Sequence, residues 1–360
     1  MLSTINASLV ALVTLMTVLP LSRYPAWWVR DMDFPRLQIV ILALSVLIFQ
    51  WAVVGLEDKS DRILSVITLA CLIYQGFWII PYTKIYPKEV KVGALKGKAE
   101  RVRILSSNVL EPNRNAQGLI ALVREHQPDV FVTLETNHWW QEQLSVLESD
   151  YPYTLKCPLE NLYGMHVYSR HPLEDSAIQF LVQPGIPSMH AMLVLPSQRR
   201  VRMHFLHPAP PSPTENDEST QRDVELLIVA KSVAELDTPV IVAGDLNDVA
   251  WSETTRLFRK ISGLLDPRVG RGMFNTFHAG HWFMRWPLDH FFHSSHFTLS
   301  FIKRLPAFGS DHFPVLVELI YDESAKERQE GLTATDHDQV LSEEKIHEEP
   351  VSASQVHEPR

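Results

Sequence analysis

The chain has 360 residues, of which 46% are hydrophobic and 21% are charged, and its formal net charge is −9 at pH 7. This length allows one large domain or two modest ones, each with a buried core. The negative charge argues against a basic nucleic-acid-binding protein. The two cysteines, Cys71 and Cys157, lie far apart and exclude a disulfide framework or a cysteine-based zinc site.

The first part of the chain contains three long apolar runs without charged residues, at residues 6–21, 37–55 and 63–81. A helix needs about 20 apolar residues to cross a bilayer, so the first run is slightly short. It could instead be a signal peptide, but it lacks a basic start and a small-residue cleavage site. Aromatic residues gather near the ends of the runs, as at membrane interfaces: Trp27, Trp28, Trp51, Trp78 and Tyr82. We predict three transmembrane helices within residues 1–81, with a buried helical core as the alternative.

Three spans would place the N-terminus and the rest of the chain on opposite faces of the membrane. The second face carries most of the basic residues: Arg23, Arg30 and Arg36 in the first connection, then Lys84, Lys88, Lys91, Lys96 and Lys98. The first face has only Lys59 and Arg62 besides the amino terminus. The positive-inside rule therefore predicts that the main domain is cytoplasmic, and a different span count would reverse this prediction. Residues 82–100 are interpreted as a basic linker.

Beyond this linker, strand-like runs rich in Val, Ile, Leu and Phe alternate with helical patterns. The strand-like runs are residues 102–105, 130–133, 165–168, 191–195, 201–206, 240–243, 288–293 and 315–319. Helical spacing of apolar residues occurs in residues 115–127 and 225–236. Many strands and few helices predict a layered α/β or α+β sandwich over residues 101–321. Residues 322–360 are acidic and polar, and we expect this tail to be disordered.

Polar side chains follow abruptly on several of these strand-like runs. They are Asn108 in SSNV, Glu135 in TLETN, His207 in HPAPP, Asp245 and Asn247 in GDLND, Asp289 in LDHFF, and Asp311 and His312 in GSDHFP. Such groups are costly at strand ends unless they face a metal, a substrate or water. Carboxylate and amide oxygens suit a hard divalent cation, and an Asp–His pair can activate water. Each motif alone is weak evidence for a catalytic site, but the ordered set of motifs predicts metal-dependent hydrolysis of a phosphate ester.

The motifs SSNV, TLETN, GDLNDVAWS, LDHFF and GSDHFP together resemble those of the endonuclease/exonuclease/phosphatase superfamily, over residues 101–320. This superfamily includes deoxyribonuclease-I-like enzymes, abasic-site endonucleases, neutral sphingomyelinases and inositol polyphosphate 5-phosphatases. The resemblance implies a four-layer α/β sandwich with two central β-sheets and the site at one end. The apolar runs make the chain similar to membrane-anchored bacterial-type members, which implies an integral protein of a bacterial inner membrane.

The resemblance also implies which residues hold the metal. Asn108 and Glu135 are similar to the metal-site pair, with Glu135 as the principal ligand, and Asp311 resembles a further acid near the ion. The implied cofactor is Mg²⁺, with Mn²⁺ as the alternative. Some abasic-site endonucleases have an acid two residues after the first Asn, where this chain has Leu110 followed by Glu111. This difference weakens the case for that DNA-repair subgroup.

The resemblance implies catalytic roles for five residues. Asp245 resembles the residue that activates the attacking water, and Asn247 resembles its partner in orienting the phosphate. His312 is similar to the histidine that contacts the phosphate and acts in acid–base chemistry, and Asp289 to the acid that orients this histidine. His207 resembles the histidine that stabilises the phosphate or protonates the leaving group. Four polar residues near the motifs are interpreted as structural: His166, Arg170, His204 and His290.

Three functions remain open from the sequence. The first is a membrane-anchored phosphoesterase, with a lipid headgroup, a nucleotide or a sugar phosphate as the substrate and membrane lipid as a partner. The second is a nuclease acting on nucleic acid, although the predicted catalytic segment is net acidic and a duplex-binding enzyme usually presents a basic face. The third is an inactive membrane scaffold, which we would expect to have lost Asp245, Glu135 or His312. No protein partner is indicated.

Overall fold

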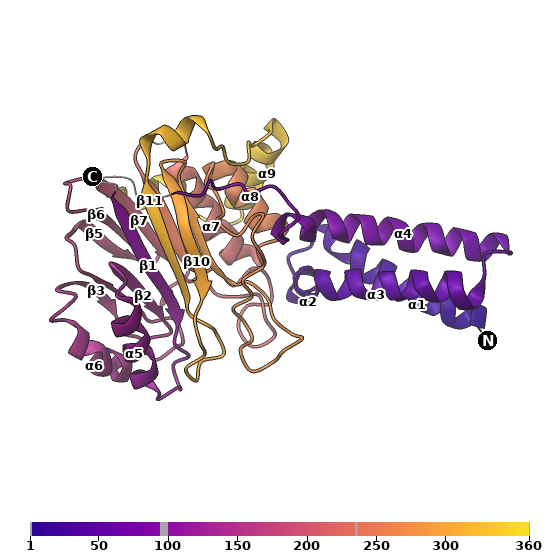
Figure 1. The fold of residues 1–360 in the computed structure, drawn as a ribbon, viewed down its shortest axis with the longest axis horizontal. Helices are drawn as coiled ribbons and strands as arrows, with labels where there is room; N and C mark the ends of the chain where they lie inside the picture. Colours follow the sequence, from indigo (N-terminus) through magenta and orange to yellow (C-terminus); the bar gives the residue numbers. More distant parts are fainter. Residues whose placement is uncertain (1, 94–99, 235–236, 360) are drawn as a thin grey trace.

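The computed structural model describes residues 2–93, 100–234 and 237–359, in which a long helical bundle projects from a β-sandwich domain (Figure 1). The bundle consists of α1 (Leu2–Val18), α3 (Arg36–Phe49) and α4 (Lys59–Ile79). Short helical segments extend or connect these helices: η1 (Leu19–Ser22), α2 (Trp27–Arg30), η2 (Asp31–Asp33), η3 (Gln50–Val54) and η4 (Ile80–Tyr82). Three stretches are long and apolar enough to cross a membrane: Leu2–Ser22, Arg36–Val54 and Lys59–Tyr82. The first is longer than its apolar run because the helix begins at Leu2.

The bundle buries several polar side chains among the apolar ones between its helices, and it exposes large apolar side chains on its outer surface. Asn6 donates to the Asp61 carboxylate at 3.0 Å and accepts from the Gln50 amide at 3.0 Å, and all three residues are buried. Large apolar side chains such as Val66 and Ile73 point outward and are exposed. Water would penalise this outer surface, whereas helices in a bilayer expose apolar groups to lipid and join through polar contacts. The distribution therefore fits a membrane-spanning bundle.

The domain contains two stacked mixed sheets with a continuous apolar core between them. The first sheet has the order β10 (Phe297–Arg304), β11 (Val315–Tyr321), β1 (Arg101–Asn108), β2 (Val130–Leu134), β4 (Met165–Ser169) and β3 (Tyr153–Cys157). The second has the order β5 (Leu173–Gln179), β6 (Ser188–Val194), β7 (Arg200–Leu206), β8 (Val240–Asp245) and β9 (Asp289–His293). Strands β1 and β2 are parallel neighbours, as are β7 and β8.

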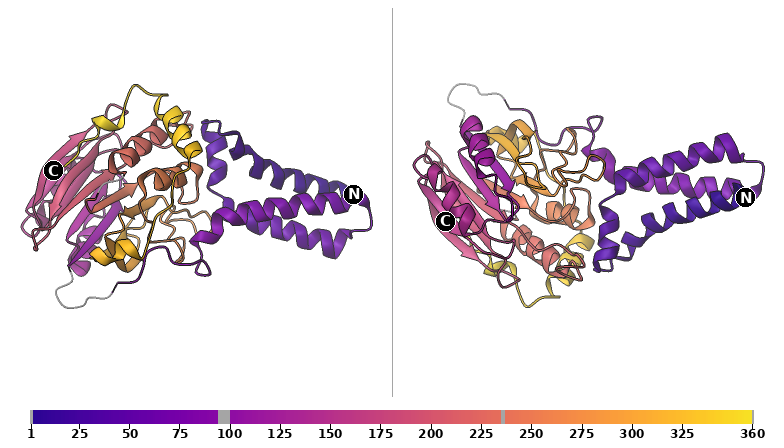
Figure 2. Two further views of the ribbon diagram at one scale, coloured as in Figure 1. Left: turned by 90° about the horizontal axis from the view of Figure 1, so that it is seen from above. Right: turned by 90° about the horizontal axis from the view of Figure 1, so that it is seen from below.

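Helices cover the outer face of each sheet and complete four layers. On the first sheet lie α5 (Ala116–His126), α6 (His138–Leu144) and the short η5 (Ser145–Leu147). On the second lie α7 (Thr220–Val233) and α8 (Glu253–Ser262), on the side nearer the bundle (Figure 2). The predicted four-layer sandwich with two central sheets, preceded by apolar helices, is confirmed.

The sequence patterns missed three strands, and all three are edge strands. Strands β3 and β10 are the two edges of the first sheet, and β5 is an edge of the second. Their outward positions are polar or half-exposed, as in the stretch Leu173–Gln179. An edge strand has one neighbour and less burial, so its sequence lacks the apolar run on which the prediction depended.

The tail after Tyr321 is ordered in its described residues, contrary to the expectation of disorder. It forms η6 (Glu323–Glu327), α9 (Asp336–Ile346) and η7 (Ala353–Gln355). Three apolar side chains of the tail join the core over α7 and α8: Leu341, Ile346 and Val356. Lysines pair across the contact, with Lys260 bonding Asp338 at 2.8 Å and Lys345 bonding Asp223 at 2.9 Å. The tail is therefore held by apolar contacts and by ion pairs in both directions, which composition alone could not reveal.

The domain packs directly against the near end of the bundle. Tyr82, at the end of α4, donates to the Ala250 carbonyl at 2.5 Å, and the Trp251 indole donates to the Asp33 carbonyl at 2.9 Å. Both domain residues follow β8 and lie in an apolar cluster with Ile79. The predicted linker continues along the domain as far as residue 93, where the Gly93 amide bonds to Leu299. Lys96 and Lys98 of that prediction lie outside the described residues.

Candidate active site

The strand ends bring four of the predicted residues together at one end of the sandwich. Asn108 ends β1, and Glu135 directly follows the parallel neighbour β2. Both side chains therefore lie where the carboxyl ends of these two strands meet. Asp245 ends β8 and lies opposite Asp289, the first residue of the antiparallel β9. The Asn108 side-chain amide donates to Glu135 at 2.7 Å and to Asp245 at 3.2 Å. This amide therefore links the end of the first sheet to the end of the second sheet.

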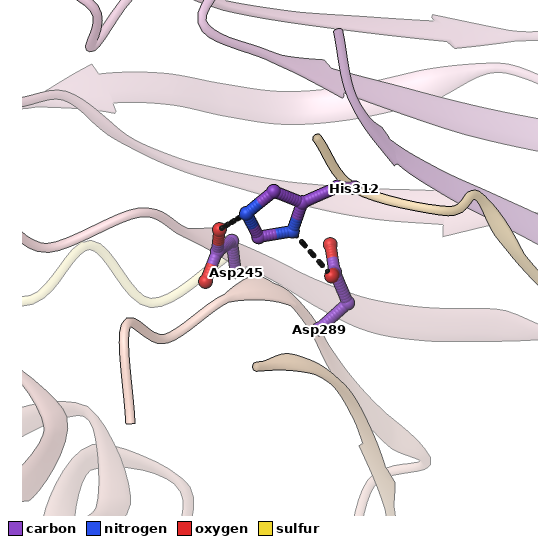
Figure 3. Close-up of side chains that lie close together, drawn as sticks. All are labelled: Asp245, Asp289 and His312. Atoms are coloured by element: carbon purple, nitrogen blue, oxygen red, sulfur yellow. Dashed lines mark hydrogen bonds and ion pairs between the residues drawn. The ribbon is translucent and has the colours of Figure 1, made fainter. Parts of the chain in front are cut away.

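A histidine lies between two carboxylates beside this link (Figure 3). His312 contacts Asp289 through Nδ1 at 2.8 Å and Asp245 through Nε2 at 3.4 Å, and all three side chains are buried. Burial alone would disfavour the charged imidazole, but the carboxylates of Asp289 and Asp245 outweigh it and raise the pKa of His312 to about 10. The ring is therefore positively charged at neutral pH and is held in one orientation by both acids.

Negative charge exceeds positive charge in this region. Burial raises the pKa of Glu135 to about 7, and the carboxylates of Asp311 and Asp245 nearby add to this effect. His312 and the Asn108 amide oppose it but do not cancel it. Several buried carboxylates with one imidazolium form a donor set that a divalent cation would stabilise. The residues present therefore fit a divalent cation.

Two neighbouring groups of side chains could hold the cation. Asp245, Asp289 and His312 offer ligand atoms that all lie within 4.8 Å of one another. The other group is the one predicted from the sequence, Glu135 with Asp311, whose charge adds to the effect of burial in raising the pKa of Glu135. Asn108 presents its nitrogen to Glu135, and its oxygen accepts from the Leu110 amide at 3.0 Å. In this arrangement Asn108 orients the Glu135 carboxylate.

The remaining predicted residues surround the same centre. The Asn247 backbone amide donates to Asp245 at 2.9 Å, and its side chain donates to the Pro208 carbonyl at 3.0 Å. His207 is buried, and burial is the main cause that lowers its pKa to about 4. It is therefore a neutral imidazole close enough to feel the charge of Asp245. Its Nδ1 is buried and has no hydrogen-bond partner among the described atoms.

The motifs missed three residues that shape the site. The Ser310 hydroxyl donates to the Asn108 carbonyl at 2.8 Å and accepts from the His312 amide at 3.0 Å, which ties the two motifs together. The Phe277 ring lies 5.0 Å from the His312 ring. Arg222, buried in α7, donates to the Asn247 carbonyl at 2.8 Å. Ser310 was visible within GSDHFP, whereas no local pattern marks Phe277 or Arg222 as site residues.

Two of the three histidines interpreted as structural are engaged elsewhere in the domain, whereas the buried Nε2 of His166 has no partner among the described atoms. His290 bonds to Arg268 at 2.7 Å and to the Asp248 carbonyl at 2.9 Å. His204 bonds to His190 at 2.6 Å and to Arg202 at 2.8 Å. Their ring nitrogens are therefore used in packing networks inside the sandwich, consistent with the structural interpretation.

This sandwich, with the acids, amide and histidines at one end, defines a class of phosphoester hydrolases. Residues 105–312 match the model of the Endonuclease/Exonuclease/phosphatase family, and the chain belongs to that family. Its enzymes are typically dependent on divalent metals. No curated protein sequence matches the chain.

Solved structures with the same fold are distant in sequence. A humanized TDP2 from D. rerio is 16% identical with a TM-score of 0.50, covering 61% of this chain and 98% of that chain. A family protein from Bacteroides thetaiotaomicron is 18% identical with a TM-score of 0.50, covering 63% and 100%. The human Nocturnin catalytic domain is 16% identical with a TM-score of 0.50, covering 62% and 98%. At such identities the likeness shows the fold alone.

Proposed function

We propose that the protein is a membrane-anchored, divalent-metal-dependent phosphoesterase that hydrolyses phosphate esters by in-line attack of water. One observation carries the proposal: a continuous chain of contacts joins Glu135, Asn108, Asp245, His312 and Asp289 at the ends of both sheets. It combines a candidate metal ligand, a base and an oriented acid in one place, as phosphoester hydrolysis requires.

Each residue has a task in this proposal. Asp245 accepts the proton of the attacking water, and the amide of Asn108 together with the backbone of Asn247 holds its carboxylate in place. The His312 imidazolium binds a phosphate oxygen and stabilises the charge that develops on it, while Asp289 orients the ring. A Mg²⁺ ion, or Mn²⁺ as the alternative, held by Glu135 and Asp311 would supply further charge stabilisation.

Two groups complete the proposed site on the substrate side. Asn247 orients the scissile phosphate through the side-chain oxygen, since its nitrogen is occupied by Pro208. His207 stabilises the phosphate or hands a proton to the leaving group. The unpartnered Nδ1 and the neutral state of the ring support this role, because a buried neutral imidazole can either donate or accept.

Metal removal tests the proposal directly. We expect EDTA to abolish hydrolysis of bis(p-nitrophenyl) phosphate by the full-length protein in detergent, and excess Mg²⁺ or Mn²⁺ to restore it. The same preparation should then be tested on phospholipids, nucleotides and nucleic acids to identify the substrate class. A rate that survives complete chelation would overturn the metal-dependent mechanism, and preference for nucleic acid would favour the nuclease alternative.

We also propose that the bundle spans a bacterial inner membrane with the domain in the cytoplasm. Six described basic residues lie on the domain's side of the predicted spans: Arg23, Arg30, Arg36, Lys84, Lys88 and Lys91. The other side has Lys59 and Arg62. A green fluorescent protein fused after Arg360 should therefore fluoresce, and alkaline phosphatase fused there should be inactive. The reverse pair of results would place the domain outside.

A further inference from the structure

The loop between α8 and β9 carries three consecutive large apolar side chains that nothing in the domain covers. Trp282 is 83% exposed, Phe283 54% and Met284 42%. Single exposed apolar residues are ordinary, but a run of three large ones at a loop tip marks a contact surface. We call residues 278–285 the tip loop.

The tip loop lies beside the start of a membrane-spanning helix. The Gln38 side chain donates to the Phe283 carbonyl at 2.8 Å, and Gln38 is in the first turn of α3. The Phe34 ring, just before this helix, packs edge-on against Trp286 at 5.6 Å. Because the span Arg36–Val54 begins at the same level, the exposed tip stands where a bilayer surface would begin. Ile85, which is 84% exposed, belongs to the connection at this junction.

The base of the same loop forms a wall of the candidate site. Phe277 bonds through its backbone amide to the Trp286 carbonyl at 3.0 Å, and its ring lies 5.0 Å from His312. The Ala279 amide donates to the Asp311 carbonyl at 2.6 Å. The segment that reaches the bundle is therefore anchored on the residues proposed to act on the phosphate.

Two guanidinium groups lie between the tip and the site. Arg285 and Arg304 lie over the ring of Phe313, the residue after His312, at 5.1 and 4.3 Å. Neither forms an ion pair with an acid in the described part of the chain. Unpaired positive charge beside an apolar tip is the combination that binds a phosphate-bearing lipid surface.

From these contacts we propose that the tip loop inserts Trp282 and Phe283 into the membrane surface and holds the site at the lipid headgroups. The substrate is then a phosphate ester carried by a lipid of the same membrane. This inference rests on the proposed phosphoesterase function. Tryptophan favours the membrane interface because its ring is both apolar and polar, and the bundle already keeps this part of the domain at the bilayer.

Site-directed spin labelling tests the membrane contact without relying on activity. The full-length protein, with Cys71→Ala and Cys157→Ser, is labelled at Trp282→Cys and placed in phosphatidylethanolamine/phosphatidylglycerol nanodiscs. Oxygen should relax the label more strongly than a water-soluble nickel chelate does. The control is Tyr153→Cys on the edge strand β3, which is 41% exposed on the far side of the domain and should show the opposite preference. Equal chelate access at both positions would overturn the proposal, as would shielding from both reagents, which indicates a protein partner.

Paired substrates test the consequence for catalysis. We expect Trp282→Ser with Phe283→Ser to lower hydrolysis of nanodisc phospholipid at least tenfold and to change hydrolysis of bis(p-nitrophenyl) phosphate less than twofold. Tyr153→Ser should change neither rate. An equal loss on both substrates would show a structural role only, and no loss on phospholipid would also reject the inference. If the unaltered protein hydrolysed neither substrate, the proposed function would fail, while the labelling result would still decide the membrane contact.

Discussion

Asp245→Asn is expected to lower kcat for phosphate ester hydrolysis by at least about 10³-fold, because the amide cannot accept a proton from water. The substitution keeps the shape of the side chain, so its oxygen can still accept from the Asn247 amide. It also removes one of the two carboxylates that keep His312 charged. The effect therefore combines loss of the base with a weaker stabilisation of the phosphate by the positive charge of His312. Initial rates with bis(p-nitrophenyl) phosphate and Mg²⁺ measure it.

Asp237→Asn is the matched control, because this carboxylate is exposed and pairs with Lys326 away from the site. It should leave the rate unchanged. Circular dichroism of both variants should match the unaltered protein. If a correctly folded Asp245→Asn variant kept more than a tenth of the activity, Asp245 would not be the base.

His312→Ala is expected to reduce kcat by about 10²–10⁴-fold, the range for loss of a positioned acid–base group. Asp289→Asn should cost less, because the ring remains in place with Asp245 as its partner. Its distinctive effect is on the pH profile. Asp289 and Asp245 together raise the pKa of His312 to about 10. Without the charge of Asp289 the pKa of His312 falls. As the pH rises, this variant should therefore lose its imidazolium, and with it the activity, at a lower pH than the unaltered protein does.

Rates of the unaltered protein, His312→Ala and Asp289→Asn, measured from pH 6 to 10, check this prediction. His347→Ala, on the exposed surface of the tail, should behave as the unaltered protein. An unchanged alkaline limb in Asp289→Asn would mean that His312 does not act in its charged form. A His312→Ala variant with normal kcat would remove this residue from the mechanism.

The junction between bundle and domain has a consequence for the site. Trp251 and Ala250, which contact the bundle, belong to the segment that follows Asp245 and Asn247 in the chain. Arg222 supports this segment from α7 through the Asn247 carbonyl and lies 3.6 Å from Asp248. The segment that carries two proposed catalytic residues is therefore held between the bundle and helix α7.

The predictions from sequence succeeded where a local pattern carries the information. Long apolar runs identified the three long helices, and short apolar runs identified the central strands, because burial on both faces demands continuous apolar residues. The polar strand ends identified Asn108, Glu135 and Asp245 as neighbours, since strands that end at one edge bring their last residues together. Three edge strands were missed because each has a single neighbouring strand and fewer buried residues. The order of the tail was missed because its packing depends on partners distant in the chain, such as Lys260 for Asp338.

By itself, the sequence determined that three apolar helices precede a layered domain with acids, amides and histidines at its strand ends. Only the tertiary structure decided which of these groups touch. The Asn108 bond to Asp245 spans 137 positions and depends on how the two sheets stack. The Gln38 bond to Phe283 spans 245 positions and depends on how the bundle docks. Periodicity and composition indicate whether a residue is buried. Which distant residues it contacts is decided by how all the elements pack together.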